Sequence, residues 1–352
     1  MKPGIVLHFS GVTKSPFHST RQEFANLIKC APYILGSTIR GALLKRLIER
    51  GVCPHLDVLN TPHDDAQLAE IHHDCALHPF FPAEDELPSA WFSFGQFTDD
   101  DDIPLTAEQL AVRYQSHTRI ALQRETRSVT AGAIVTLESI MPETPFTFDV
   151  VLFDEARALA DGLASAARDT GTGEGWGRFR SIGLGQFKID QVTRIEIENW
   201  LAQTPWALND DDPASFTFEF VTPYVLSRGE AQMPAFDAPA ITARLNREVN
   251  QVLRAVGEPE TRAEFSDATF TIHPEFISLY SYERGLRQNS LVTLERSWAR
   301  ARANEARLAA RALTIAGRLG VGEWNTRGFG CFRRADRAHK RYGAYLSRAT
   351  QK

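Results

Sequence analysis

Two glycine-rich stretches with the same internal spacing constrain this chain more than any other feature of its sequence. The first runs from Gly175 to Phe187 and the second from Gly320 to Phe332, and each reads G-x-G-x5-G-x-G-x-F. Glycine adopts positive φ without strain and lets other backbone approach closely. Eight glycines at matched spacing indicate two copies of one tightly turned loop.

Arginines lie in or beside both loops. A run of exposed backbone N–H groups can hold an anion, and guanidinium groups match phosphate oxygens. We therefore expect both loops to contact a polyanion through Gly175, Gly177, Arg178, Arg180, Gly183, Gly185, Arg318, Gly320, Gly322, Arg327, Gly328 and Gly330. The alternative is that each loop is only a tight turn that leads into a strand.

The charge of the chain is distributed unevenly. Residues 283–352, which include Arg284 and Arg287, contain 16 Lys and Arg and 5 Asp and Glu, a balance of +11. Because the whole chain carries −5, the first 282 residues carry −16. A basic segment on an acidic protein favours a specific polyanion surface, and we include both arginines in it. The alternative is a solvated arginine-rich helix, which we expect at Ala299 to Gly317.

Composition and length favour a globular protein of two domains. The chain has 352 residues, of which 43% are hydrophobic and 24% are charged, as in soluble domains. It contains no apolar run long enough for a membrane span and begins without the apolar core of a signal peptide. Its four cysteines are too few and too scattered for a secreted disulfide scaffold. We expect a cytoplasmic protein with no membrane partner.

The first predicted helix begins after Gly36. A strand is expected over residues 4–12, and Ser37 is a plausible N-cap for the helix that follows. Arg40 and Lys45 lie off its apolar face, so this helix N-terminus is a second candidate phosphate contact.

A segment rich in histidine and cysteine follows and reads as an insertion over about residues 51–110. Thiolate and imidazole groups suit zinc, and Cys53, Cys75 and His78, with His55 as a fourth candidate, could hold one ion. The spacing fits no standard zinc finger, so ordinary loop histidines remain the alternative. No other cofactor is expected.

The order of elements repeats in the second half of the chain. Ser15-Pro-Phe17 is mirrored by Thr222-Pro-Tyr224, and a Val-Thr-Leu-Glu strand occurs in each half. We predict an α+β protein of two tandem ferredoxin-like (βαββαβ) domains, the topology of RNA recognition modules, each with its glycine loop before the last strand. The expected boundaries are 1–204 for the first domain, 205–214 for a linker and 215–352 for the second domain.

Two further motifs resemble a known family. Pro32 to Gly41 (PYILGSTIRG) is similar to the P-x-I-P-G-S-S-L-K/R-G signature of the RAMP superfamily of CRISPR-associated RNA-binding proteins, with Leu35 replacing proline. Arg119 to Ala133, expected to form a long basic hairpin, resembles that family's R-x-x-I-D-R-E-T-G-x-A-x-x-G-A stretch. Gln123 replaces Asp and Arg127 replaces Gly. Both glycine loops look like the family's own loop before the last strand.

The resemblance implies a function in antiviral defence. It is strongest to the subunit that caps the crRNA 5′ handle in type III-D-like effector complexes, which implies crRNA and other effector subunits as partners and target nucleic acid as an indirect one. Glycine-loop amides and arginines would hold sugar–phosphate, while Arg119, Arg124 and Arg127 would press against guide RNA or a neighbouring subunit. Target slicing is not expected, because no Asp lies between Ser19 and Ala31.

Two alternatives stay open. A metal-independent pre-crRNA processing endoribonuclease of the same superfamily would need a general base, for which His18 is the candidate. A protein scaffold whose glycine loops only turn the chain is the third possibility.

Overall fold

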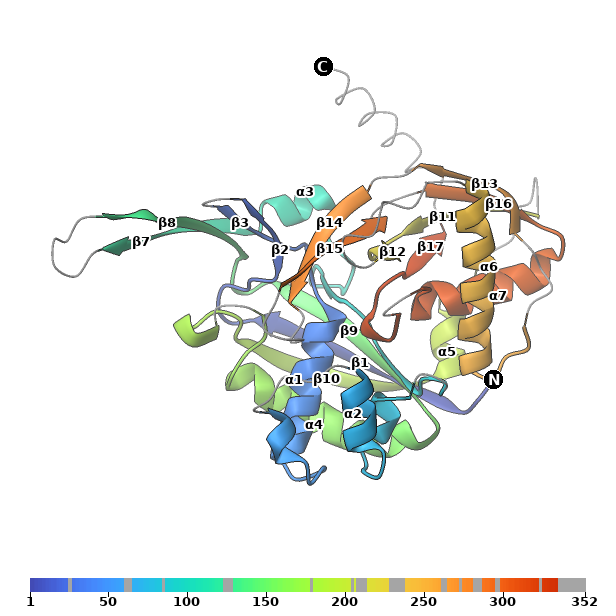
Figure 1. Cartoon of the computed structure of the whole chain (residues 1–352), viewed down its shortest axis with the longest axis horizontal. Helices are drawn as coiled ribbons and strands as arrows, with labels where there is room; N and C mark the ends of the chain where they lie inside the picture. Colours follow the sequence, from blue (N-terminus) through green and yellow to red (C-terminus); the bar gives the residue numbers. More distant parts are fainter. Residues whose placement is uncertain are drawn as a thin grey trace, which may run out of the picture.

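The chain folds as an α+β protein, as predicted (Figure 1). The computed structural model describes residues 1–24, 27–59, 65–83, 86–122, 129–177, 180–203, 206, 214–227, 238–260, 265–271, 274–280, 287–294, 298–322 and 325–334. No helix within these residues is both long and apolar enough to cross a bilayer.

The first half of the chain is built on one antiparallel sheet. Its elements are β1 (Gly4–Thr13), α1 (Gly36–Glu49), β4 (Tyr33–Ile34), β5 (Ala90–Phe92), β6 (Gly95–Phe97), β9 (Pro145–Phe153), α4 (Ala160–Thr172) and β10 (Phe187–Glu196). The strands lie in the order β10-β1-β9-β6-β4, and β5 also pairs with β9. With β5 and β6 together as the second strand, the order is the 4-1-3-2 of a ferredoxin-like βαββαβ unit. The predicted insertion therefore contains a core strand, whose two short pieces are too brief to show a strand pattern.

Helices α1 and α4 pack against each other beside this sheet (Figure 1). Ile39, Leu43 and Leu47 are buried on α1 at helical spacing, as their periodicity predicts. The α1 N-cap position is Leu35, which makes no side-chain cap bond. The prediction that Ser37 caps the helix is thus wrong, because the helix begins one residue before it.

The second half repeats the same topology. Its elements are β11 (Ser215–Phe220), α6 (Ala238–Ala255), β13 (Phe265–Thr271), β16 (Trp298–Ala303), α7 (Ala306–Leu319) and β17 (Phe332–Arg334). The strands lie in the order β13-β16-β11-β17. This is the same 4-1-3-2 order, read from the other edge of the sheet. The predicted arginine-rich helix is correct only from Ala306 onward, because residues 298–303 form a strand between β11 and β13.

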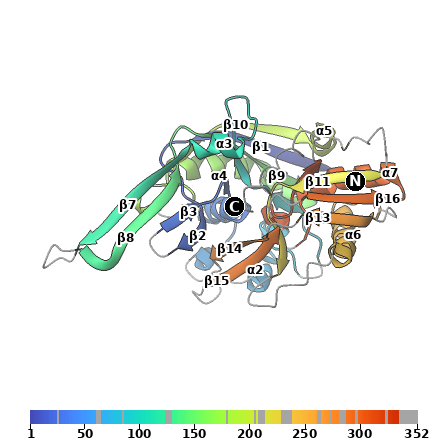
Figure 2. The same ribbon diagram turned by 90° about the horizontal axis from the view of Figure 1, so that it is seen from above.

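Two outer sheets carry the Val-Thr-Leu-Glu segments. The first contains β2 (Thr20–Phe24), β3 (Leu27–Cys30), β7 (Tyr114–Leu122) and β8 (Val129–Ile140), and the second contains β12 (Tyr224–Ser227), β14 (Pro274–Tyr280) and β15 (Arg287–Leu294). These segments are strands, as predicted, but they lie outside the core sheets. The third strand of each βαββαβ unit is β9 in the first half and β16 in the second. The β7–β8 hairpin projects away from the body as an arm (Figures 1 and 2).

The remaining short helices are α2 (Asp65–His72), α3 (Ala107–Ala111) and α5 (Ile197–Ala202). Helix α5 joins the two halves, and one apolar core runs across the junction: Val6 and Val151 of the first sheet share it with Trp200 of α5 and Phe218 of the second sheet. Trp206, within the predicted linker, is buried against Phe218 and Phe332. The junction is therefore a packed interface.

A polar cluster closes one side of this junction. His8 Nδ1 lies 2.7 Å from Asp149 Oδ1, and Trp200 Nε1 donates to Asp149 Oδ2 at 3.2 Å. The Arg318 guanidinium lies over the Trp200 ring at 4.3 Å. The hydrogen bond to Asp149 raises the pKa of His8 above its ordinary value. His8 is therefore a protonation-sensitive contact beside the interface of the two halves.

This cluster predicts how stability depends on pH. A histidine with a raised folded-state pKa stabilises the folded state fully below its unfolded pKa of about 6.5, and this contribution is lost as pH rises through the folded value. The stability advantage of wild type over His8→Gln should therefore shrink between pH 6 and pH 8.5 in denaturant titrations. His73→Gln, at an exposed histidine, is the control; an advantage of His8 that stays constant with pH would contradict the assignment.

Candidate nucleic-acid interface

Each glycine loop is closed by the Pro-containing motif that follows the first strand of its domain. The Gly185 N–H donates to the Pro16 carbonyl at 2.9 Å, and the Gly330 N–H donates to the Pro223 carbonyl at 2.9 Å. The hydroxyl groups of the two motifs also make equivalent bonds. The Ser15 hydroxyl accepts from the Gln186 N–H at 2.9 Å, and the Thr222 hydroxyl accepts from the Cys331 N–H at 2.8 Å. The mirrored motifs in the sequence thus make the same hydrogen bonds to the glycine loop in each domain.

Glycine is required in these loops because other backbone atoms lie very close to its Cα. All eight loop glycines have φ between +69° and +87°. A Cβ on Gly185 would overlap the Trp176 carbonyl oxygen, and a Cβ on Gly330 would overlap the Val321 carbonyl oxygen. A side chain at either position would separate the two arms of the loop.

The loop amides are largely bonded within the protein. In the first loop, the N–H groups of Gly175, Gly183 and Gly185 donate to protein carbonyls. Their counterparts Gly320, Gly328 and Gly330 do the same. A phosphate cradle made of these six amides would have to break those bonds, which makes the loop side chains the more accessible contacts for an anion.

The two loops differ in what surrounds them. The tip of the second loop is docked on the first domain: Phe329 is fully buried and packs edge-on against Phe94, with ring centroids 4.9 Å apart. The Arg327 carbonyl lies against Gly36 at the start of α1, where a Cβ would overlap it. The glycine of the PYILGS motif is thus required by this contact.

The equivalent tip of the first loop is open. Arg180, Ile182 and Gly183 are exposed, and a Cβ on Gly183 would meet no atom within 4 Å. The described part of the first loop's tip is therefore exposed, whereas the tip of the second loop is docked on the first domain.

The arginines of the loops have correspondingly different positions. The exposed Arg180 guanidinium lies 3.4 Å from Glu174. Arg318 stacks on Trp200, and burial lowers its pKa. Arg327 is half-buried at the docked tip, while Arg178 lies outside the described residues. Arg180 is the loop arginine that the structure places at an open surface.

The basic residues of α1 are engaged with other groups. Arg40 donates to the Phe80 carbonyl at 2.5 Å and lies over the Phe81 ring. Lys45 pairs with Glu174 at 2.6 Å and with Glu49 at 3.4 Å.

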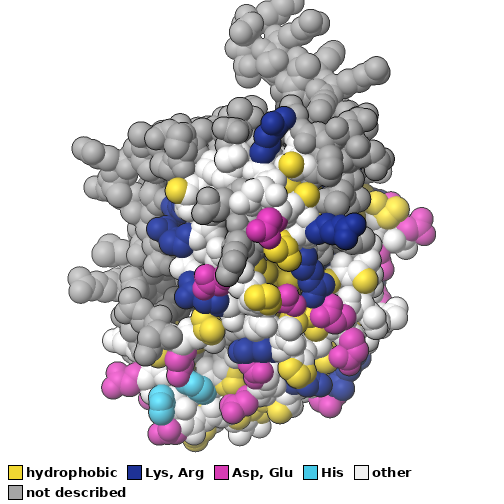
Figure 3. Space-filling model, turned by 90° about the vertical axis from the view of Figure 1, so that its right-hand side faces the viewer, with side chains coloured by type: hydrophobic (Ala, Val, Ile, Leu, Met, Phe, Trp, Pro, Cys, Tyr) yellow, Lys and Arg dark blue, Asp and Glu magenta, His cyan; other side chains and the backbone are white. Residues whose placement is uncertain are grey.

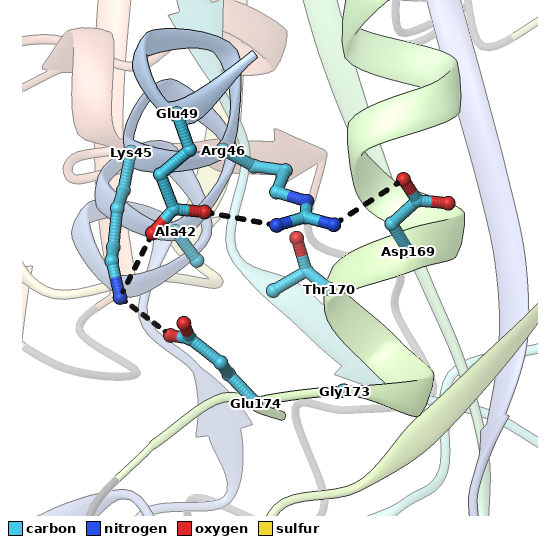
Figure 4. A pocket seen from close by; sticks show the side chains of 8 residues that line it. All are labelled: Ala42, Lys45, Arg46, Glu49, Asp169, Thr170, Gly173 and Glu174. Atoms are coloured by element: carbon cyan, nitrogen blue, oxygen red, sulfur yellow. Dashed lines mark hydrogen bonds and ion pairs between the residues drawn. The ribbon is translucent and has the colours of Figure 1, made fainter.

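Figure 4 shows the ion pairs of Lys45 around a pocket between α1 and α4. Arg46 also joins it through Glu49 and Asp169. The half-buried Ser37 lies in the first turn of α1, away from these charges. Since carboxylates alternate with the cations, the pocket does not have the one-sided charge of an anion site.

The other predicted basic contacts are described only in part. Arg119 lies on β7 and Arg287 on β15, while Arg124, Arg127 and Arg284 lie outside the described residues. On the face covered by α5, α6 and α7, basic and acidic side chains are interspersed (Figure 3). Arg311 of α7, for instance, pairs with Glu198 and Glu258. Among the described residues, the +11 segment forms no purely basic patch on that face.

His18, the candidate general base, is fully buried. Its Nδ1 lies 2.6 Å from the Glu138 carbonyl oxygen, to which it donates. A buried ring bonded in this way does not reach an external phosphate, so the geometry does not favour the nuclease alternative.

The predicted zinc ligands are brought together in part. Ligand atoms of Cys53, His55 and Cys75 lie within 4.8 Å of one another. His78 lies apart and pairs with Glu86. His72, which sequence reasoning missed, lies beside both sulfurs: its Nδ1 is 3.4 Å from Cys53 Sγ and 3.2 Å from Cys75 Sγ. The His72-x-x-Cys75 spacing at a helix end was the signal that could have identified it.

Comparison with known proteins gives one family. The model of the RAMP superfamily matches residues 13–188, half of the chain, which include the first glycine loop. No curated protein sequence matches.

Two solved structures are similar at low identity. The first is a chain of the type III-B Cmr-beta complex bound to cognate target RNA, at 14% identity and a TM-score of 0.36; the match spans 55% of this chain and 61% of that one. The second is a Cas6 product complex, at 13% identity and a TM-score of 0.42, with 94% of this chain and 100% of that one covered.

The two loop tips give a matched pair of substitutions. Gly183 and Gly328 occupy the same loop position with φ of +87° and +84°, so alanine brings the same strain of about 1–2 kcal/mol to each. At Gly328 the added Cβ would also lie 2.6 Å from the Phe94 ring and backbone. Gly328→Ala should therefore lower the free energy of unfolding by about 1–3 kcal/mol more than Gly183→Ala does, as measured by denaturant titration. Equal losses would show that the second loop is not docked as described.

Proposed function

The chain belongs to the RAMP superfamily, and on that premise we propose that it is an RNA-binding subunit of a CRISPR effector complex that holds the 5′ handle of crRNA. The family supports an RNA ligand, and the resemblance of the PYILGS motif and the Arg119–Ala133 stretch to the handle-capping subunit supports the finer assignment. Other effector subunits are the expected protein partners.

The observation that carries this proposal is the open tip of the first glycine loop. The second loop shows that such a tip accepts a partner surface, and in this protein the first domain occupies it. The first tip has no such covering within the described residues and presents Arg180 and the exposed Ile182. A cation beside an apolar side chain suits a single strand of RNA, in which phosphate and splayed bases are both accessible.

Arg180 is well placed to exchange partners. Its side chain is 42% exposed, and its guanidinium lies 3.4 Å from the carboxylate of Glu174, whose side chain is 49% exposed. An ion pair this accessible contributes little to stability. Glu174 also binds Lys45 at 2.6 Å, which lowers the pKa of its carboxyl. Lys45 therefore remains as a partner for Glu174 when a phosphate takes Arg180.

The β7–β8 arm supplies a second RNA-facing element in this proposal. It belongs to the same domain as the first loop and projects from the body (Figures 1 and 2). Beyond its pairing with β3 the arm is a two-stranded ribbon, which is marginal in water, so a partner that covers it would add stability. Its basic residues would press on guide RNA or on the next subunit.

Substitutions at Arg180 and Glu174 test the proposal. Arg180→Ala should weaken binding of a labelled crRNA with its handle about tenfold, because a charge-assisted phosphate contact is lost. It should also reduce the slope of log K against log salt by about 0.7, the value for one phosphate of a single strand. Glu174→Gln should tighten binding, because it removes a competing carboxylate. Fluorescence anisotropy across a salt series measures all three effects.

Arg194→Ala is the matched control, because Arg194 is also exposed and ion-paired but lies at the far end of β10 from the loop. Unchanged affinity for Arg180→Ala, or equal affinity of wild type for handle-containing crRNA and duplex DNA, would overturn the assignment. Metal-independent cutting of repeat RNA by wild type would transfer the chain to the processing enzymes.

A further inference from the structure

Four potential metal ligands converge where the segment after α1 meets the end of α2. Cys53 and His55 follow α1 in the chain, while His72 ends α2 and Cys75 lies in the turn after it. Three of them have ligand atoms within 4.8 Å of one another, and His72 Nδ1 lies 3.4 and 3.2 Å from the two sulfurs.

The two distances from His72 to the sulfurs are close to the edge length of a tetrahedral zinc site. With metal–ligand bonds of about 2.0–2.3 Å, neighbouring ligand atoms of such a site lie roughly 3.3–3.8 Å apart. Cys53 and His72 are almost fully buried, and Cys75 is half-buried. Two thiolates and two imidazoles form a donor set typical of structural zinc.

The backbone around both sulfurs is arranged for thiolate ligands. Cys53 Sγ accepts a hydrogen bond from the His55 N–H at 3.4 Å, and Cys75 Sγ accepts one from the Leu77 N–H at 3.4 Å. Each cysteine thus receives the N–H of the residue two positions later. Hydrogen bonds of this kind orient metal ligands and stabilise their negative charge.

The surrounding structure also holds the histidine in position. The His72 ring stacks on the Phe81 ring at 4.5 Å, and the Arg40 guanidinium lies over the same Phe81 ring, 4.8 Å from its centroid. Arg40 is on α1, so the cluster is fastened to the helix that supports the first glycine-loop domain.

A metal explains how this segment can be ordered. The described residues between 53 and 75 form one helix of eight residues and one 3₁₀ turn and bury few apolar side chains. A helix this short is marginal without a further cross-link. We infer that Cys53, His55, His72 and Cys75 bind one structural Zn²⁺ ion, which fastens residues 53–75 to α1. The inference is independent of RNA binding.

Elemental analysis of untagged protein tests this directly. Wild type should contain about one equivalent of zinc per chain, and Cys53→Ser and Cys75→Ser should each contain less than about a tenth. His78→Ala and His73→Ala are the matched controls, since both histidines are close in sequence but outside the cluster, and both variants should keep the ion. Cobalt-exchanged wild type should show the absorption bands of a tetrahedral thiolate site.

The wild-type measurements decide the matter even where a cysteine variant fails to fold. A chelator should lower the melting temperature of wild type by several degrees, and added zinc should restore it. Less than about a tenth of an equivalent of zinc in wild type would overturn the inference. So would a Cys53–Cys75 disulfide found by mass spectrometry in the purified protein, or loss of zinc on His78→Ala but not on His55→Ala.

Discussion

The structure depends on one repeated backbone contact, the hydrogen bond from the last glycine of each loop to the proline carbonyl at the end of the domain's first strand. The bond forms at 2.9 Å in both domains, and at the same glycine the two arms of the loop lie so close that a Cβ would overlap the carbonyl oxygen of Trp176 or Val321. The bond ties the segment after the first strand of each ferredoxin-like unit to the glycine loop before the last strand, beside the point where these two strands pair. The glycine spacing is therefore a folding constraint first, and any ligand contact is built on top of it.

The two loops of the duplicated unit have different surroundings. Phe329 of the second loop is buried against Phe94 of the first domain, and its neighbouring carbonyl fits against Gly36. Together with the apolar core shared across α5, this contact fixes the two halves relative to each other. The first loop makes no equivalent contact among the described residues and retains an exposed arginine. Its openness is the physical basis for assigning RNA contact to the first domain.

The duplication and the fold class could be predicted from the sequence, whereas features that depend on tertiary contacts could not. Matched glycines and mirrored Ser/Thr-Pro-aromatic motifs report local backbone geometry, so the duplication and the α+β topology were predictable. Alanine and arginine favour a helix locally and so predict one from Ala299, whereas pairing with β11 and β13 makes residues 299–303 part of a strand. Which loop is docked and whether His18 is buried depend on tertiary contacts, which the spacing of residues does not encode.

Hydrogen–deuterium exchange of the protein with and without handle-containing crRNA tests the central claim most directly, because it reports both loops in one experiment. RNA should slow amide exchange in residues 175–186 and along the β7–β8 arm, and should leave residues 320–331 unchanged, because the second loop is already covered by the first domain. Slowed exchange confined to residues 320–331, or no change in either loop at saturating RNA, would contradict the account.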